Sequence, residues 1–340
     1  MSKKINTDPI NFARIIKFIK GCFFKSTVLA LIFILLLFLF LYRFTDKIFS
    51  NDYVLNTMLK TNIYSRQCLY LHEDDPNLVK KLNDFYSSSA NKYLVLPVFF
   101  NNMPTSLAGI KDLQLKKDTY INILLPILLK VQKEVLNERA RLIEINSRMI
   151  NEPVMAEDFA FIDYLADKYN VKLKNDDFWT YVDAIDELLL RVDIIPTSIA
   201  LGISAKETGW GASRFLQEGN SLFSQWTFDE NSGIIPLGRE SHQNHVVKKF
   251  DTLEDAIRSF YININTHNSY KEFRNMRRRM RISDGTLNAR RLVPALYRYS
   301  AEKDYTDILY NIILTNSLGK FDNYTTFSTQ YRNICLTVLN

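Results

Sequence analysis

The stretch Ile203-Ser-Ala-Lys-Glu207-Thr-Gly-Trp-Gly-Ala-Ser-Arg-Phe215 ends one helical pattern and begins a sharp turn. Apolar residues lie four, seven and eight positions before Glu207, which places its carboxyl on the apolar side of a helix. Two glycines follow and permit a tight turn that brings an aromatic ring beside the acid. The pattern therefore predicts a carboxyl group held in an apolar pocket at a helix end.

A carboxyl group held against apolar and aromatic groups keeps its proton more readily than one in water. A glycosidase needs such a protonated carboxyl to protonate the departing glycosidic oxygen. The other interpretation is a glutamate at a helix C-terminus that turns out to water. The motif alone leaves both interpretations of Glu207 open.

The sequence on both sides of this stretch, over residues 155–320, is mostly helical. Thr197 or Ser198 can cap the helix that ends near Glu207. Thr252 and Asp255 have the spacing of a capping box. These patterns predict an α+β arrangement, mainly α. The expected elements are helices at 156–169, 177–191, 197–207, 252–265 and 304–315, interrupted by one hairpin-like stretch in which a turn at 229–233 joins two short strands.

The residues before this domain predict a helical membrane-proximal region over 45–150, of undisclosed role. An extended run covers residues 93–104, and a long amphipathic helix follows at 117–149. Pro126 is expected to kink this helix or to mark its first turn.

The N-terminal 43 residues predict a membrane anchor. Residues 1–25 carry six lysines and arginines against one aspartate, so most of the net charge of +6 lies there. The near-neutral remainder argues against a nucleic-acid partner. Residues 26–42 contain no charge, and we expect a transmembrane helix at 26–43, the alternatives being a cleaved signal peptide or a buried helix. The positive-inside rule places the basic tail 1–25 in the cytoplasm and residues from about 45 outside.

The cysteines and histidines indicate little metal chemistry. Cys68 and Cys335 are the two thiols expected on the oxidising side, where they can form a disulfide; two unrelated buried thiols are the alternative. The chain has four histidines and no Cys-x-x-Cys, so we expect no metal and no other cofactor. We likewise expect no metal site at His245 or His267.

Two motifs carry a family resemblance. The Glu207 motif, followed by Asn220-Ser-Leu-Phe223, resembles the glucosaminidase domain of glycoside hydrolase family 73, and within it the Bax-type members. The element from Tyr299 to Tyr305 is similar to a second family motif. Thr208 replaces the usual serine and Ser224 the usual glycine. The resemblance extends over most of residues 93–320.

This resemblance implies a lysozyme-like helical domain with a small β-lobe at 155–320, followed by a tail at 321–340. It also implies a cell-wall hydrolase of the bacterial envelope that cleaves peptidoglycan on the reducing side of N-acetylglucosamine. Glu207 is then the general acid, and Tyr299 positions the sugar or the nucleophile. Glu240 is the candidate base, with Asp229 and Glu230 as rivals.

Further residues of the motifs are candidate substrate contacts. Trp210 and Trp226 can stack on sugar rings, Asn220 and Gln225 can bind acetamido groups, and Tyr305 belongs to the second motif. Core packing is the alternative role for the aromatic residues. The basic run from Arg274 to Arg281 is interpreted as a solvated helix face, with anionic wall polymers or membrane lipid as weaker options.

Other functions remain open at this point. A lytic transglycosylase or muramidase on the same scaffold uses a similarly placed glutamate and differs in the chain end that it produces. A non-catalytic glycan-binding scaffold would keep the aromatic residues of the cleft while tolerating loss of the acid.

Overall fold

The computed structural model describes residues 70–71, 76–87, 95–149, 154–175, 177–239 and 244–324. Residues Gln67–Asn340 form one compact unit. The predictions for the basic tail, the anchor at 26–43, the Cys68–Cys335 pair, Glu240 and residues 325–340 lie outside the described residues. Within the described ranges no helix is both long and apolar enough to cross a bilayer.

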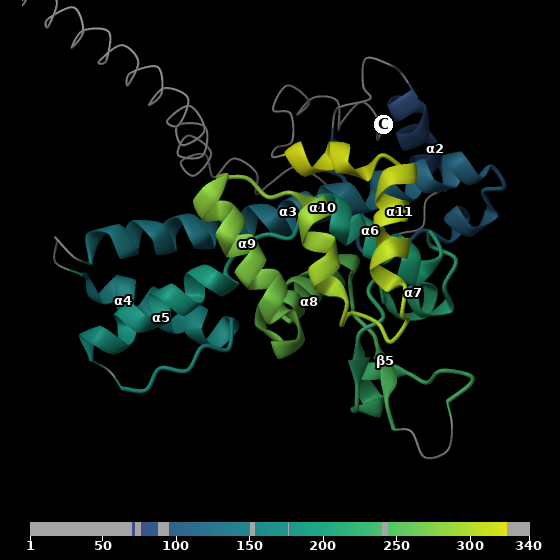
Figure 1. Ribbon diagram of the computed structural model, residues 1–340. Helices are drawn as coiled ribbons and strands as arrows, with labels where there is room; N and C mark the ends of the chain where they lie inside the picture. The colour runs from purple at the N-terminus through teal and green to yellow at the C-terminus, as the bar shows by residue number, and fades with distance from the viewer. Residues whose placement is uncertain are drawn as a thin grey trace, which may run out of the picture. The chain divides into compact units, whose positions relative to one another are not determined.

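Helices make up most of the described chain, which confirms the mainly α class (Figure 1). The helices predicted at 117–149 and within 155–320 are confirmed to within a few residues. The α-helices are α2 (Pro76–Ser87), α3 (Leu113–Arg148), α4 (Ala156–Lys168), α5 (Phe178–Arg191), α6 (Thr197–Thr208), α7 (Arg214–Gly219), α8 (Leu253–Thr266), α9 (Lys271–Ser283), α10 (Ala289–Leu292) and α11 (Tyr305–Thr315). The 3-10 helices are η2 (Thr105–Gly109), η3 (Glu230–Ser232), η4 (Asn268–Tyr270), η5 (Val293–Leu296) and η6 (Leu318–Asn323).

Among the residues that the structure describes, five short strands form two small sheets. Strands β1 (Tyr70–Leu71) and β2 (Phe99–Phe100) pair in parallel. Strands β3 (Trp226–Thr227) and β4 (Gly233–Ile234) both pair antiparallel with β5 (Val246–Lys248), which lies between them. We call residues 226–248 the β-lobe. Its three strands extend away from the helices (Figure 1).

The β-lobe corrects one prediction. The turn expected at 229–233 contains η3 and does join two strands, but these strands do not pair with each other. Their common partner β5 comes later in the chain, which a local turn signal cannot indicate. Gly233 permits the close pairing, because a Cβ there would lie 2.1 Å from Val246 Cγ2.

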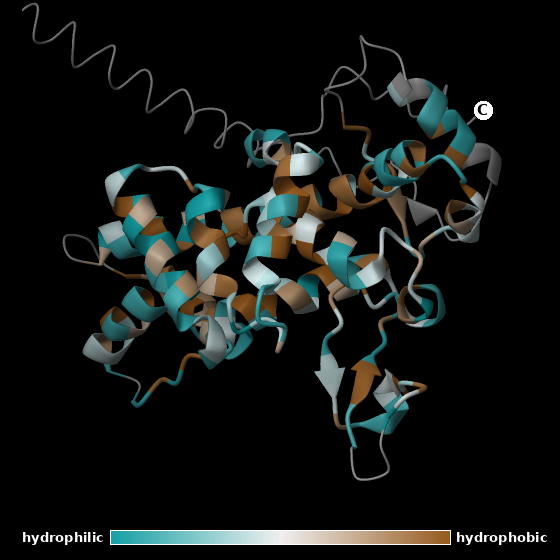
Figure 2. Cartoon of the chain, turned by 45° about the vertical axis from the view of Figure 1, so that its right-hand side comes forward, coloured by the Kyte–Doolittle hydropathy of each residue, from teal (hydrophilic) through white to brown (hydrophobic). Residues whose placement is uncertain are grey.

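Helix α6 lies at the centre of the core. Nearly all of its residues are buried, and α3, α11 and η6 pack around it. Gly202 lets α11 approach closely, since a Cβ at this position would lie 2.8 Å from Leu309 Cδ1. Hydrophobic residues gather on the sides of the helices that face one another, and hydrophilic ones face outward (Figure 2). Because α6 has no solvated face along most of its length, only its last turn reaches the surface.

The start of α6 is capped from a distant part of the chain. Asp322 in η6 accepts hydrogen bonds from the backbone N–H and the hydroxyl of Ser198, both at 2.8 Å. A carboxylate at this position also interacts favourably with the positive end of the helix dipole. The predicted cap by Thr197 or Ser198 is therefore wrong, whereas the Thr252 cap of α8 is confirmed.

Helix α3 belongs to the same core. It packs against α5, α6 and α8, and Gln132 donates to Ile195 O at 3.0 Å and to Thr197 Oγ1 at 2.9 Å. No break in the core separates this helix from the domain that follows residue 150. Pro126 lies inside α3 and not in its first turn, because the helix begins at Leu113.

The basic run on α9 is not a solvated face. Arg277 is 1% exposed and donates to the carbonyls of Leu190 and Arg191, where α5 ends. Arg274, also buried, donates to Ile264 O and His267 O at the end of α8. The last carbonyls of a helix have no partner within it, and a buried cation satisfies them. The predicted solvated face is thus wrong for its two buried members.

Asp193 compensates this buried positive charge. Its carboxylate is 2% exposed and lies 2.8 Å from Arg281 Nη2 and 3.8 Å from the Nε atoms of Arg277 and Arg139. Burial acts to raise the pKa of Asp193, but the three guanidinium groups hold it below its ordinary value. The stabilisation from Asp193 is therefore present above the unfolded-state pKa of about 3.9 and is lost as the pH falls through the lowered folded-state pKa.

We expect Asp193→Asn to lower the free energy of unfolding at pH 7 by about 3 kcal/mol, because it leaves buried cations uncompensated. The difference from the unchanged protein should shrink below about pH 4. Urea unfolding at pH 7 and pH 3 measures both effects. Asp186→Asn is the matched control, because Asp186 forms an exposed pair with Arg278. A loss no larger than that of the control at pH 7 would contradict this assignment.

Candidate active site

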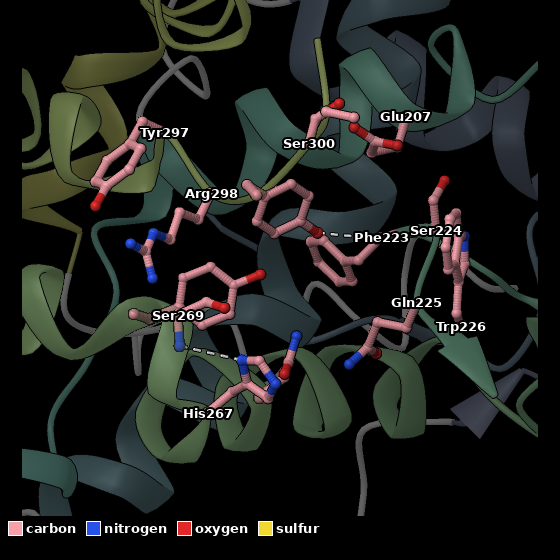
Figure 3. A pocket seen from close by; sticks show the side chains of 14 residues that line it. Glu207, Phe223, Ser224, Gln225, Trp226, His267, Ser269, Tyr297, Arg298 and Ser300 are labelled. Atoms are coloured by element: carbon pink, nitrogen blue, oxygen red, sulfur yellow. Dashed lines mark hydrogen bonds between the residues drawn. The ribbon is translucent and has the colours of Figure 1, made fainter. Parts of the chain in front are cut away.

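A cleft of about 880 Å³ opens at the C-terminal end of α6. Its walls come from α6, the segment between α7 and β3, the end of α8 with η4, and the loop between η5 and α11 (Figure 3). Glu207 is the only carboxylate among the described residues that line it. The lining residues are Glu207, Phe223, Ser224, Gln225, Trp226, Asn263, His267, Ser269, Tyr270, Tyr297, Arg298, Tyr299, Ser300 and Ala301.

The turn after Glu207 is fixed by the hydroxyl of Thr208. This hydroxyl donates to Ser204 O at 2.7 Å and accepts from Gly211 N at 3.1 Å. It also lies 2.9 Å from the Tyr120 hydroxyl, which must be the donor because the Thr208 proton is already used. One donor and two acceptor positions are thus filled. The replacement of the usual serine by Thr208 keeps the hydroxyl that this network needs.

Glycines allow the turn to fold against the rest of the core. Gly209 caps α6 with a left-handed φ of 56°, a conformation that glycine adopts without steric cost. A Cβ at Gly211 would lie 2.4 Å from Leu107 Cδ2 in η2. The sequence therefore turns sharply after α6 and leaves the Glu207 side chain at the cleft.

Two tyrosines of the second motif lie beside Glu207, as the sequence predicts. The Tyr305 hydroxyl donates to Glu207 Oε1 at 3.1 Å. Its ring stacks on Tyr299, with the centroids 5.4 Å apart, and the Tyr299 hydroxyl donates to Phe223 O at 2.9 Å. Lys206 Nζ lies over the Tyr305 ring at 4.9 Å and pairs with Glu302 at 2.6 Å. Glu207 is therefore held from a second helix, α11.

The tyrosines of the cleft are proton donors at neutral pH. Burial, then the neighbouring Tyr305 and Glu207, raises the pKa of Tyr299 well above its ordinary value. Burial, then the charge of Glu207, likewise raises the pKa of Tyr305. Burial raises the pKa of Tyr270 to about 12, although a hydrogen bond with Asn263 opposes this rise. None of the three can act as a base near neutrality.

Trp226 and Gln225 form another wall of the cleft. The Trp226 side chain is 66% exposed and stacks on His245, with a centroid distance of 4.1 Å. Gln225 Nε2 donates to Ser259 O at 3.4 Å, while its Oε1 is buried without a hydrogen-bond partner.

Three predicted substrate contacts do not line the cleft: Tyr305, which contacts Glu207 instead, and Trp210 and Asn220. Trp210 packs edge-on against Tyr120, with the ring centroids 5.8 Å apart, and lies under the Lys117 ammonium. Asn220 ends α7 in a left-handed conformation, and its Nδ2 donates to Asn102 Oδ1 and to two backbone carbonyls. Both residues stabilise the turns around the site, and the structure does not bring them to Glu207.

The described residues do not place a second carboxylate at the cleft. Glu240 lies outside them. Asp229 accepts from Asn231 N at 3.0 Å as the cap of η3, and Glu230 pairs with Arg239 at 3.0 Å. Neither lines the cleft, so the base remains a prediction. The part of the chain described here also holds no group of three or more His, Cys, Asp or Glu side chains arranged for a metal ion.

Sequence reasoning missed the far end of the cleft. Tyr297 and Arg298 line it from the loop before α11, and His267 and Ser269 from the end of α8 and η4. The signal that could have identified Arg298 is its position directly before Tyr299 of the second motif. No spacing rule marks the other residues.

Comparison with known proteins indicates the class of this domain. Residues 182–318 match the glucosaminidase family, described as mannosyl-glycoprotein endo-beta-N-acetylglucosaminidase. This range contains every residue that lines the cleft. This part of the chain is therefore similar to a family of glycoside hydrolases.

The chain is also similar to the protein Bax of Escherichia coli (strain K12). The two are 30% identical over 130 residues, which are 38% of this chain and 46% of Bax. About half of the length of that relative is thus matched. No solved structure shows a significant match. Helix α3, which supplies Tyr120, precedes the range of the family match.

The Thr208 network leads to a prediction about stability. Thr208→Val leaves Gly211 N–H without this partner and removes one of the two side-chain hydrogen bonds of Tyr120, so we expect a loss of about 2–3 kcal/mol in the free energy of unfolding. Thr208→Ser keeps the hydroxyl and removes one methyl group, so the loss should be near 1 kcal/mol. Urea unfolding compares the two variants. Equal losses would show that the hydroxyl does not hold the turn.

Proposed function

We propose that this protein is a peptidoglycan hydrolase, an endo-acting β-N-acetylglucosaminidase that cuts cell-wall glycan strands on the reducing side of N-acetylglucosamine. One observation carries the proposal: Glu207 is the sole carboxylate among the described residues lining the 880 Å³ cleft of a domain similar to glucosaminidases. A cleft of this size accommodates sugar units.

Glu207 has the surroundings of a general acid. Its Oε1 accepts from Tyr305, and its Oε2 has no hydrogen bond to another described residue. Oε2 is therefore the atom from which a proton can pass to the glycosidic oxygen of a bound strand. The rigid turn after α6 keeps this carboxyl in position before the substrate arrives.

The remaining walls of the cleft suit an N-acetylated sugar. The exposed Trp226 ring offers a flat apolar face to a sugar ring. Gln225, which lines the cleft, is the predicted partner of the acetamido group. The Tyr299 hydroxyl uses its proton on Phe223 O and keeps acceptor capacity for a sugar hydroxyl or the attacking water.

We assign the base to Glu240, in the β-lobe. An inverting enzyme separates its two carboxyl groups by roughly 6.5–9.5 Å to admit a water molecule. Assistance by the substrate acetamido group is the alternative route. The Glu240→Gln variant distinguishes them, because it abolishes cleavage only on the first route.

We further propose that residues 26–43 anchor the chain in the inner membrane of a bacterium and hold the catalytic domain on the outer side. The support is the charge asymmetry of the N-terminal sequence together with the Bax-type resemblance. The partner is then the peptidoglycan strand itself.

The test of this proposal uses the full chain in detergent and purified sacculi, with the new chain ends identified by mass spectrometry. We expect reducing N-acetylglucosamine ends. Glu207→Gln should lower the rate by about 10²–10⁴-fold, the usual contribution of a general acid. Glu218→Gln is the control, because Glu218 is an exposed partner of Arg214 outside the cleft.

Other chain ends would identify the rival functions. Anhydro-muramic acid ends indicate a lytic transglycosylase, and reducing muramic acid ends indicate a muramidase. Strand binding without cleavage by the unchanged protein indicates a glycan-binding scaffold.

Trp226 provides a second prediction. If its ring stacks on a sugar, Trp226→Ala should weaken strand binding by about 5- to 10-fold, the equivalent of about 1 kcal/mol. Trp179→Ala is the matched control, because Trp179 is 73% exposed on α5 and does not line the cleft. Binding of soluble glycan strands to both variants gives the comparison. Equal affinities would remove Trp226 from the site.

A further inference from the structure

The two ends of the cleft differ in charge. Trp226, Ser224 and Glu207 lie toward one end, and Tyr297, Arg298 and His267 lie toward the other (Figure 3). Arg298 is the only lysine or arginine among the described lining residues, just as Glu207 is the only carboxylate. The cleft thus presents an acid at one end and a cation at the other.

Arg298 has no acidic partner in the described part of the chain. Its guanidinium lies 5.4 Å from the centroid of the Tyr297 ring. No ion pair or hydrogen bond joins it to another described residue. By contrast, Arg278 and Arg281 on α9 pair with Asp186 and Asp193. The Arg298 guanidinium is therefore available to a ligand in the cleft.

His267 adds a donor to the same end. Its Nδ1 accepts from Ser269 N at 3.2 Å, which requires the neutral ring to carry its proton on Nε2. Its carbonyl accepts from the buried Arg274 at 2.9 Å, so the backbone that carries the ring is fixed. The cleft end around Arg298 thus offers hydrogen-bond donors, and none of the described residues there offers a carboxylate in return.

Neutral glycans have no group that matches such an end. Peptidoglycan does, because every second sugar carries a lactyl group that is either a free carboxylate or extended by a peptide with carboxylates. A guanidinium binds a carboxylate through two parallel hydrogen bonds, and such charge-assisted bonds are stronger than neutral ones. The chemistry of this cleft end therefore favours an anionic strand.

We infer that Arg298, supported by His267, recognises a carboxylate of the glycan strand at the end of the cleft opposite Glu207. It is a specificity-determining residue that favours acidic cell-wall glycans over neutral N-acetylated glycans. This inference rests on the proposed function, since it assigns the substrate class at the same site.

The test compares strands that differ only in charge. Soluble peptidoglycan strands are used as isolated, and a second portion is amidated with carbodiimide and ammonia so that each carboxylate becomes a neutral amide. A third portion, freed of its peptides by an amidase, keeps only the lactyl carboxylate. The full chain is assayed on all three for kcat/KM, and Glu207→Gln is assayed for strand binding.

We expect the unchanged protein to prefer the native strands over the amidated ones by about 5- to 10-fold, the contribution of one partly exposed charge-assisted contact. Arg298→Gln should bring the ratio of kcat/KM on native strands to kcat/KM on amidated strands to about 1. Arg298→Lys should keep only part of the preference for native strands. Added salt should lower the ratio. The peptide-free strands identify the source of the carboxylate. A kcat/KM as high as that on native strands assigns the lactyl carboxylate, and one as low as that on amidated strands assigns the peptide.

Arg290→Gln is the matched control. Arg290 is also exposed and also lies over a tyrosine, 5.5 Å from the Tyr310 ring centroid, but it does not line this cleft. It should leave the ratio as it is in the unchanged protein. Equal kcat/KM for native and amidated strands, or an unchanged ratio in Arg298→Gln, would overturn the inference.

The binding measurement separates this inference from the proposed function. If no strand is cleaved, the proposed function fails. The inference then stands or falls on whether Glu207→Gln binds native strands more tightly than amidated ones, and whether adding Arg298→Gln to that variant removes the difference.

Discussion

The site depends on the hydrogen bonds of the Thr208 hydroxyl. It joins three parts of the chain at one buried point: Ser204 in the preceding turn of α6, Gly211 in the following turn, and Tyr120 in α3. Glu207 is the residue directly before it, so the position of the carboxyl follows from the geometry of this network. Because Tyr120 precedes the range of the family match, α3 is part of the scaffold of the site and not only a connection to it.

The same logic of distant support applies to the whole of α6. A helix buried on nearly all sides cannot satisfy its end groups with water, so other elements must do so. Asp322 in η6 caps its start, and Tyr305 in α11 binds Glu207 at its end. Arg277 satisfies the last carbonyls of α5, as Asp322 satisfies the N–H of Ser198 at the start of α6. A rigid core with few unsatisfied groups thus presents one carboxylate at one opening.

Short sequence patterns predicted the features that depend on neighbouring residues. Helix extents and the Thr252 cap follow from apolar spacing and capping residues. The structure brings the motif residues Glu207, Gln225, Trp226 and Tyr299 to one cleft, and Tyr305 contacts Glu207. The failures involve partners far along the chain. Three features depend on tertiary contacts that a short stretch of sequence does not reveal: the Asp322 cap, the burial of Arg274 and Arg277, and the strand order of the β-lobe. Trp210 and Asn220 belong to the motif because the turns need them.

The protonation of the cleft limits how the proposed reaction can proceed. Tyr270, Tyr299 and Tyr305 keep their protons near neutrality, because burial raises the pKa of each. His267 accepts at Nδ1 from the backbone and so carries its proton on Nε2. If Glu207 is the acid, no described lining residue is left to activate water. The base must then come from the glycan strand itself or from a residue that does not line the described cleft. The β-lobe brings Trp226 to the cleft, and Glu240 belongs to the sequence of the same lobe.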